Sequence, residues 1–115
     1  VNPRFLILDE MTAGLDEYHC EMMRLIFKQI AANGSGVLVI THRIDDVINA
    51  DRVVVLKDGH VMASGPPGTV LANIDDCARW DVEIPKARVL AQELKKAGVP
   101  IKGLPLSYRE LIESL

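Results

Sequence analysis

The segment FLILDEMTAGLD, residues 5–16, decides the fold class of this chain. It begins with four apolar residues and continues directly into two adjacent carboxylates, Asp9 and Glu10. A short apolar run next to turn-forming residues is typical of a buried strand, and side chains at the carboxyl end of such a strand lie where α/β sheets form ligand sites. The acid pair alone is a weak indication of function, because strands often end in solvated acids and helix caps favour aspartate.

Two further apolar runs, at residues 37–40 and 53–56, follow helical patterns. Together with residues 5–8 they predict buried parallel strands of an α/β fold. The helix between the first two strands is expected to begin after Asp16, which can cap it, and to end at Asn33-Gly34. Its apolar positions at helical spacing are Met22, Met23, Ile26, Phe27 and Ile30.

The third apolar run continues into Asp58-Gly59, a dipeptide that strongly indicates a hairpin. Residues 61–64 are expected to return along it and to give the sheet an antiparallel ending. A short helix over residues 44–48 is expected before the hairpin, and a helical turn over residues 69–72 after it.

From Asn73 onward the sequence becomes acidic and then mixed in charge. We therefore expect a domain boundary between residues 1–74 and residues 75–115. Pro85 suits the first turn of a helix, and Ser107 with Glu110 matches a capping box that begins a last helix. The expected apolar faces of these two helices are Leu90, Ala91, Leu94 and Ala97, and Leu111, Ile112 and Leu115.

Length and charge narrow the possible functions. The chain has 115 residues and a formal net charge of −3, which gives no electrostatic indication of nucleic-acid binding. We therefore expect no nucleic-acid partner. Cys20 and Cys77 lack the spacing of zinc ligands and are expected to be ordinary thiols in a reducing compartment. No apolar run approaches the ~20 residues with which a helix crosses a bilayer.

The acid pair suits phosphoryl transfer. One acid can hold Mg²⁺ through water while another residue orients the attacking water, and we assign these roles to Asp9 and Glu10 respectively. His42 follows the second apolar run and could donate to a phosphate oxygen near neutral pH. Taken by itself, a histidine at a strand end is more often a solvated loop residue.

The residues around these positions carry a more specific pattern. Residues 5–16 together resemble the Walker B motif and D-loop of ABC ATPases, in which the acids are followed by Pro-Thr, a small pair, Leu and Asp. Met11 stands where the family has proline, a departure that affects the stiffness of the turn more than the chemistry. Thr41-His42 is similar to the family's switch histidine.

This resemblance implies ATP and Mg²⁺ as ligands of a composite site between two ATPase subunits. In that site Asp9 would hold Mg²⁺ through water, and Glu10 would orient the attacking water. His42 would reach the terminal phosphate. Asp16, in the D-loop, would meet the opposite subunit.

Residues 50–61 resemble the hairpin that closes the nucleotide-binding domain of transporter ATPases. Residues 85–111 look like the C-terminal extension of energy-coupling-factor transporter ATPases, which packs against its counterpart in a second ATPase subunit. The resemblance implies an importer for a vitamin or a metal ion at the cytoplasmic face of the membrane. Its partners would be that second subunit, a transmembrane coupling protein and a substrate-binding membrane component.

The glycine-rich phosphate loop, the glutamine loop and the signature sequence of the family are not found, and all three precede Walker B in ABC ATPases. We therefore expect the C-terminal half of a P-loop NTPase domain, inactive alone, with an exposed apolar surface that promotes self-association. Two alternatives remain. Residues 75–115 could form a non-catalytic dimerisation module, or the chain could come from a repair or chromosome-maintenance ABC ATPase.

Overall fold

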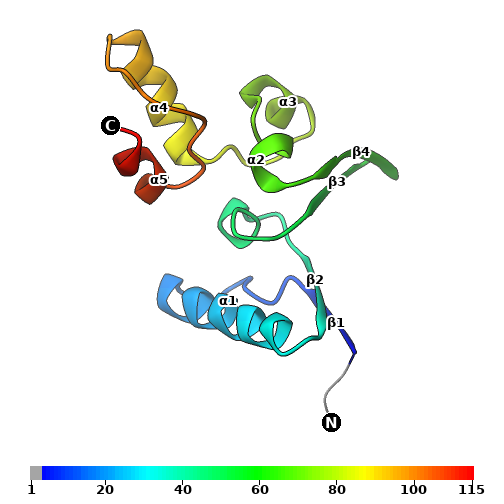
Figure 1. The fold of residues 1–115 in the computed structure, drawn as a ribbon. Coiled ribbons are helices and arrows are strands. Elements are labelled where there is room, and N and C mark those ends of the chain that lie inside the picture. The colour runs from blue at the N-terminus through cyan, green and yellow to red at the C-terminus, as the bar shows by residue number, and fades with distance from the viewer. Residues whose placement is uncertain (1–3) are drawn as a thin grey trace. The chain divides into compact units, whose positions relative to one another are not determined.

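The computed structural model describes residues 4–115, which form an α/β fold (Figure 1). Two compact units are present: an N-terminal unit ending at His42 and a C-terminal unit spanning Arg43–Leu115. The expected boundary near residue 74 lies within the second unit, and a separate functional role for residues 75–115 stays a prediction. Among residues 4–115, no helix combines the length and the apolarity that a bilayer crossing requires.

The N-terminal unit is a single β-α-β element. Strands β1 (Phe5–Asp9) and β2 (Gly36–Ile40) pair in parallel, with Leu8 opposite Val39, and α1 (Glu17–Ala32) connects them. The first two apolar runs are therefore parallel strands, as predicted. This connection brings the carboxyl ends of both strands to the same edge of the sheet.

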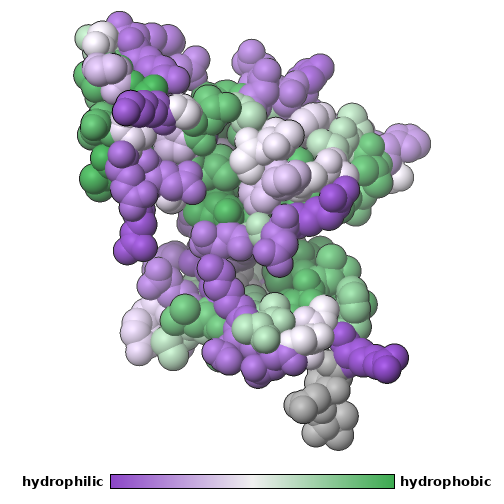
Figure 2. Space-filling view, viewed as in Figure 1, coloured by the Kyte–Doolittle hydropathy of each residue, from purple (hydrophilic) through white to green (hydrophobic). Residues whose placement is uncertain are grey.

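The expected burial of these strands is wrong for one face of the sheet. Side chains alternate along a strand, so α1 covers only the face that carries Leu8, which is buried. The opposite face is exposed and carries Phe5, Ile7, Leu38 and Ile40. Figure 2 shows hydrophobic surface over β1 and β2, which is the exposed apolar surface that the sequence analysis expected.

Helix α1 begins and ends where the sequence predicts, with Asp16 as its N-cap and Asn33 as its C-cap. Its sheet-facing side carries the buried residues Cys20 and Phe27. Met22 and Ile26, two of the apolar positions at helical spacing, are exposed. At about 100° per residue these two positions lie well off the side that Cys20 and Phe27 share.

The C-terminal unit contains the predicted hairpin, formed by β3 (Val53–Lys57) and β4 (His60–Gly65). Asp58 and Gly59 have φ values of 51° and 76°, the left-handed conformation that a tight two-residue hairpin turn requires. Within residues 4–115, β3 pairs antiparallel with β4, which gives the antiparallel hairpin that the sequence predicts. The tight turn brings β4 beside β3 at little loop-closure cost, whereas an apolar run does not specify its pairing partner.

Short helices make up the rest of this unit. The helix expected over residues 44–48 is only a 3₁₀ turn, and a helix that the sequence analysis missed follows Asn73, whose side chain accepts from the amides of Asp75 and Asp76. Ser107 caps the last helix as predicted, and the Glu110 carboxylate accepts from the amide of Leu106. The helical elements are η1 (Ile44–Asp46), α2 (Pro67–Val70), α3 (Ile74–Arg79), α4 (Lys86–Lys96) and α5 (Tyr108–Glu113).

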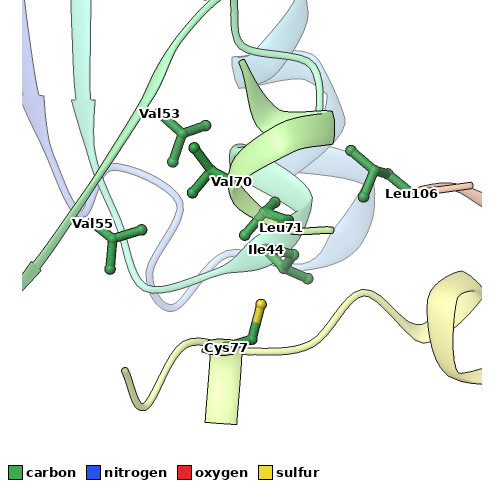
Figure 3. Close-up of a cluster of buried hydrophobic side chains, with 7 residues drawn as sticks. All are labelled: Ile44, Val53, Val55, Val70, Leu71, Cys77 and Leu106. Atoms are coloured by element: carbon green, nitrogen blue, oxygen red, sulfur yellow. The ribbon is translucent and has the colours of Figure 1, made fainter. Parts of the chain in front are cut away.

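One hydrophobic core joins the hairpin to η1, α2, α3 and the loop before α5 (Figure 3). It draws residues from both sides of residue 74, and Trp80 packs against it. The Glu83 carboxylate adds a polar link by accepting from the amide of Ile44 at 2.9 Å. The buried members of the core are Ile44, Val53, Val55, Val70, Leu71, Cys77 and Leu106.

Candidate active site

The candidate site lies at the carboxyl edge of the parallel sheet. Asp9 ends β1, Ile40 ends β2, and the two residues are partners in the strand register. The Glu10 amide continues the ladder by donating to the Ile40 carbonyl at 2.8 Å. The chain segments that carry Glu10 and His42 therefore leave the sheet side by side.

Glu10 and His42 are in direct contact although 32 residues separate them in sequence. Nδ1 of His42 lies 3.1 Å from Oε1 of Glu10, so an imidazole protonated at Nδ1 donates to the carboxylate. Glu10 has a φ of 54°, which is uncommon for a residue with a side chain. The structure thus brings together the two residues that the sequence analysis assigned to catalysis.

This contact leaves one polar atom of each residue available. Within residues 4–115, no hydrogen bond or ion pair engages Nε2 of His42 or Oε2 of Glu10. The Glu10 side chain is partly exposed and that of His42 mostly exposed. The pair can therefore present a carboxylate oxygen and an imidazole nitrogen to a ligand at the sheet edge.

Asp9 is exposed at the end of β1. Its carboxylate makes no hydrogen bond or ion pair within the part of the chain that the structure describes. The same residues contain no group of three or more histidine, cysteine or acidic side chains that could hold a metal. A cation at Asp9 would therefore take most of its ligands from water or from a bound substrate, an arrangement that suits Mg²⁺.

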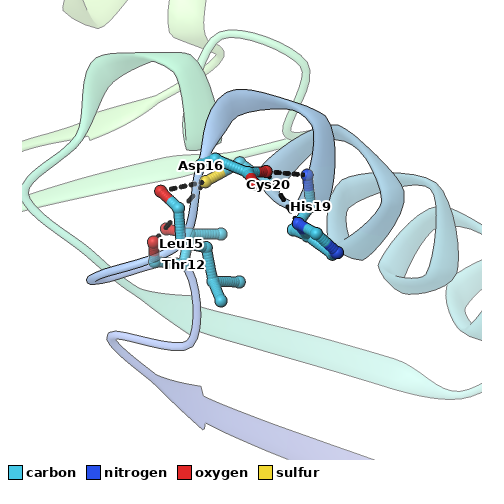
Figure 4. Close-up of polar contacts among 5 residues, drawn as sticks. All are labelled: Thr12, Leu15, Asp16, His19 and Cys20. Atoms are coloured by element: carbon cyan, nitrogen blue, oxygen red, sulfur yellow. Dashed lines mark hydrogen bonds and ion pairs between the residues drawn. The ribbon is translucent and has the colours of Figure 1, made fainter.

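The turn after the acids is attached to the first turn of α1 (Figure 4). The Cys20 thiol is fully buried and donates to the carbonyls of Thr12 and Leu15, at 3.5 Å and 3.7 Å. Thr12 is buried as well. This role of Cys20 was not predicted, although its position four residues after the helix cap places it in the first turn of α1.

Asp16 shapes the end of this turn. Its carboxylate accepts from the backbone amide of His19 at 2.8 Å and from Nδ1 of the same residue at 2.7 Å (Figure 4). The backbone hydrogen bond, followed by the side-chain one, lowers the pKa of Asp16 below its ordinary value. Asp16 therefore acts as a helix cap, as predicted, while its contact with an opposite subunit stays a prediction.

The Asp16 cap predicts a pH dependence of α1 stability. A carboxyl whose pKa is lower in the folded state stabilises that state above its unfolded pKa, and the effect is lost as pH falls through the folded value. We expect Asp16→Asn to keep a helix cap but to flatten this acid dependence, and Asp16→Ala to lower the melting temperature at neutral pH as well. Circular dichroism melts at several pH values measure both effects. If the melting temperature of Asp16→Asn falls with pH as that of the wild type does, the Asp16 carboxylate is not the source of the pH dependence.

Comparison with known proteins gives sequence relatives over the whole chain, although no protein-family model matches it. The energy-coupling factor transporter ATP-binding proteins EcfA2 of Streptococcus pyogenes strains Manfredo and MGAS10750 are each 39% identical to it. In both cases the similarity covers 100% of this chain and 41% of the relative, so the chain spans about two fifths of the length of these proteins. This similarity extends over the whole chain and supports its assignment to part of an ABC ATPase of the energy-coupling-factor subfamily.

Proposed function

We propose that this chain supplies part of the catalytic site of an ATP-hydrolysing subunit in an energy-coupling-factor importer. The 3.1 Å contact between His42 and Glu10, at the carboxyl edge of a parallel sheet, carries the proposal. α/β proteins bind their ligands at this edge. The relatives are ATP-binding proteins of a transporter, which supports the choice of nucleotide.

The residues of the site would divide the work of phosphoryl transfer. Oε2 of Glu10 would accept a hydrogen bond from the attacking water and orient it. His42 holds Oε1 of the same carboxylate and would direct Nε2 towards a phosphate oxygen. Asp9, whose carboxylate has no partner within residues 4–115, fits Mg²⁺ bound through water. Bound Mg²⁺ neutralises charge on the phosphates of ATP during transfer.

Asp16 would link this site to a second ATPase subunit. It is exposed and lies at the end of the turn that begins at Glu10. Cys20 attaches this turn to α1. A contact made at Asp16 could therefore shift the turn and the start of α1 together. We propose that such a contact couples the two subunits of an ATPase dimer.

The relatives are ATP-binding proteins of energy-coupling factor transporters, and this similarity supports a role in transport. We propose that the complete assembly imports a vitamin or a metal ion and works at the cytoplasmic face of the membrane. Its other parts would be a second ATPase subunit, a transmembrane coupling protein and a substrate-binding membrane component. ATP hydrolysis would drive the uptake.

The test of this function compares the 115-residue chain with a full-length ATPase subunit that carries its sequence. We expect Mg²⁺-dependent ATP turnover from the full-length subunit, assembled with its second subunit, and none from the chain alone. The chain lacks the glycine-rich loop that would hold the phosphates. Stoichiometric ATP binding by the chain alone would show that ATP binding does not require the glycine-rich loop. Absence of turnover in the assembled ATPase would contradict the proposed function.

A second candidate function rests on the exposed apolar residues of α4 and α5. Leu90 of α4, Ile112 of α5 and Leu115 just after α5 were predicted to form apolar helix faces, and all three are exposed, Ile112 to 70%. Because α4 and α5 are in contact, their exposed apolar residues can form a common patch, and such patches are typical of surfaces that a partner covers. We propose that residues 75–115 form a dimerisation element between ATPase subunits.

Substitution of Ile112 tests this element. In the full-length subunit, we expect Ile112→Lys to weaken self-association about tenfold or more, because a lysine at a desolvated contact costs at least ~1.4 kcal/mol. Val61→Lys is the matched control, since Val61 is an exposed apolar residue of β4 outside the element. Analytical ultracentrifugation gives both association constants. Equal constants for the two variants would argue against a specific dimerisation surface on α5.

A further inference from the structure

A cavity of about 330 Å³ lies within the C-terminal unit, away from the residues assigned to ATP hydrolysis. It is bounded by the start of α3, one face of α4 and the loop that precedes α5. Its volume is at the lower end of the range for small-molecule sites. The polar side chains that line it include Arg88, Gln92 and Lys95, which follow one another along α4 at helical spacing.

Arg88 is the unusual feature of this cavity. Its side chain is buried, with the residue only 8% exposed, and Nε has no hydrogen-bond partner. No other atom of its guanidinium makes a hydrogen bond or an ion pair within residues 4–115. Burial lowers the pKa of Arg88, but arginine stays protonated in proteins. A buried positive charge is therefore left without a counter-charge, which is costly for a folded protein.

The neighbouring groups do not supply the missing negative charge. The Cys77 thiol interacts electrostatically with Arg88, but burial raises the pKa of this thiol, so it is neutral near pH 7. Asp76 is already paired with Arg79. Asp75 lines the cavity and is exposed, but makes no ion pair with Arg88. Lys95 adds a second positive charge, which makes the lining cationic overall.

We propose that this cavity binds a small anionic ligand through a carboxylate or phosphate group. The fork of Arg88 would pair with two oxygens of the anion, as guanidinium groups do with both kinds of anion. Lys95 would contribute a second charge and Gln92 a neutral donor. The site lies within the C-terminal unit and does not depend on the proposed ATPase function.

Titration of the ¹⁵N-labelled chain with inorganic phosphate, and separately with acetate, tests the site directly. Sodium chloride keeps the ionic strength constant, and chloride serves as the reference anion. We expect the Nε–Hε resonance of Arg88 to shift and saturate with at least one anion. Saturation by phosphate alone identifies a phosphate-bearing ligand, and saturation by acetate alone a carboxylate. A response that does not saturate with either anion overturns the proposal.

Variants show whether Arg88 carries the binding. Arg88→Met replaces the guanidinium with an apolar chain and should weaken binding at least tenfold, while Arg88→Lys, which keeps the charge without the fork, should lose less. Arg109→Met is the matched control, because Arg109 is exposed on α5 and does not line the cavity. If Arg88→Met does not fold, Lys95→Gln provides the comparison, with binding weakened several-fold. Anion binding at wild-type strength in the folded Arg88 variants overturns the proposed anion site. If Arg88→Met does not fold, binding at wild-type strength in Lys95→Gln overturns it.

Discussion

Glu10→Gln, made in the full-length ATPase subunit, is expected to lower ATP turnover by roughly 100- to 10,000-fold while leaving ATP binding intact. Glutamine has nearly the same size and keeps one oxygen, but it is a far weaker proton acceptor than a carboxylate. Its amide can still contact His42, so the strand ends should stay in place. Turnover is measured by phosphate release and binding by equilibrium titration with Mg²⁺-ATP.

The matched control for this variant is Glu21→Gln. Glu21 is an exposed glutamate of α1 with no contact to the Glu10–His42 pair, and its substitution should leave turnover unchanged. A double-mutant cycle with His42→Ala adds a stricter test. Because the two side chains are in contact, the effects of the two substitutions should be less than additive. Turnover preserved in Glu10→Gln would remove its proposed role.

Leu71→Ala is expected to destabilise the C-terminal unit by about 2–5 kcal/mol. Leu71 is only 1% exposed and is among the largest fully buried side chains of the described residues. Truncation leaves a cavity in a core shared by the hairpin and the helices, which can relax only in part. Urea unfolding followed by the fluorescence of Trp80 reports on this core, because Trp80 packs against it and is the only tryptophan of the chain.

Leu90→Ala is the control for this loss of stability. Both variants remove the same atoms, but Leu90 is 43% exposed on α4 and should lose much less, under about 1 kcal/mol. The urea midpoint is the appropriate comparison, since a chain of two compact units need not unfold in a single step. Equal midpoint shifts in the two variants would show that the core is not assembled around Leu71.

Helix ends and tight turns were predicted correctly where residues close in sequence determine them. The limits of α1 follow from Asp16 and Asn33, and the hairpin follows from Asp58-Gly59, because caps and tight turns depend on residues a few positions apart. The proximity of Glu10 and His42 was also predictable. Parallel strands joined by one helix place their carboxyl ends at the same edge, whatever the rest of the fold.

The extent of burial could not be predicted from the sequence. Periodicity marked Met22, Leu90 and Ile112 as members of apolar helix faces, yet all three are exposed. A helix can offer more apolar surface than its neighbours cover, and the sequence does not say how far that cover extends. Likewise, the β-branched run at residues 53–56 indicated a strand but did not specify which residues of β4 lie opposite it.

The sequence by itself determined the first β-α-β element, the hairpin, the placement of Asp9 and Glu10 at a strand end, and the resemblance to ABC ATPases. The tertiary structure alone decided which side chains lose contact with water. In the structure, Cys20 holds the turn after Asp9 and Glu10. Arg88, one of 13 lysine and arginine residues, is a buried charge that lines a cavity. Burial depends on packing between segments distant in sequence, and desolvation then changes the chemistry of residues whose sequence context is ordinary.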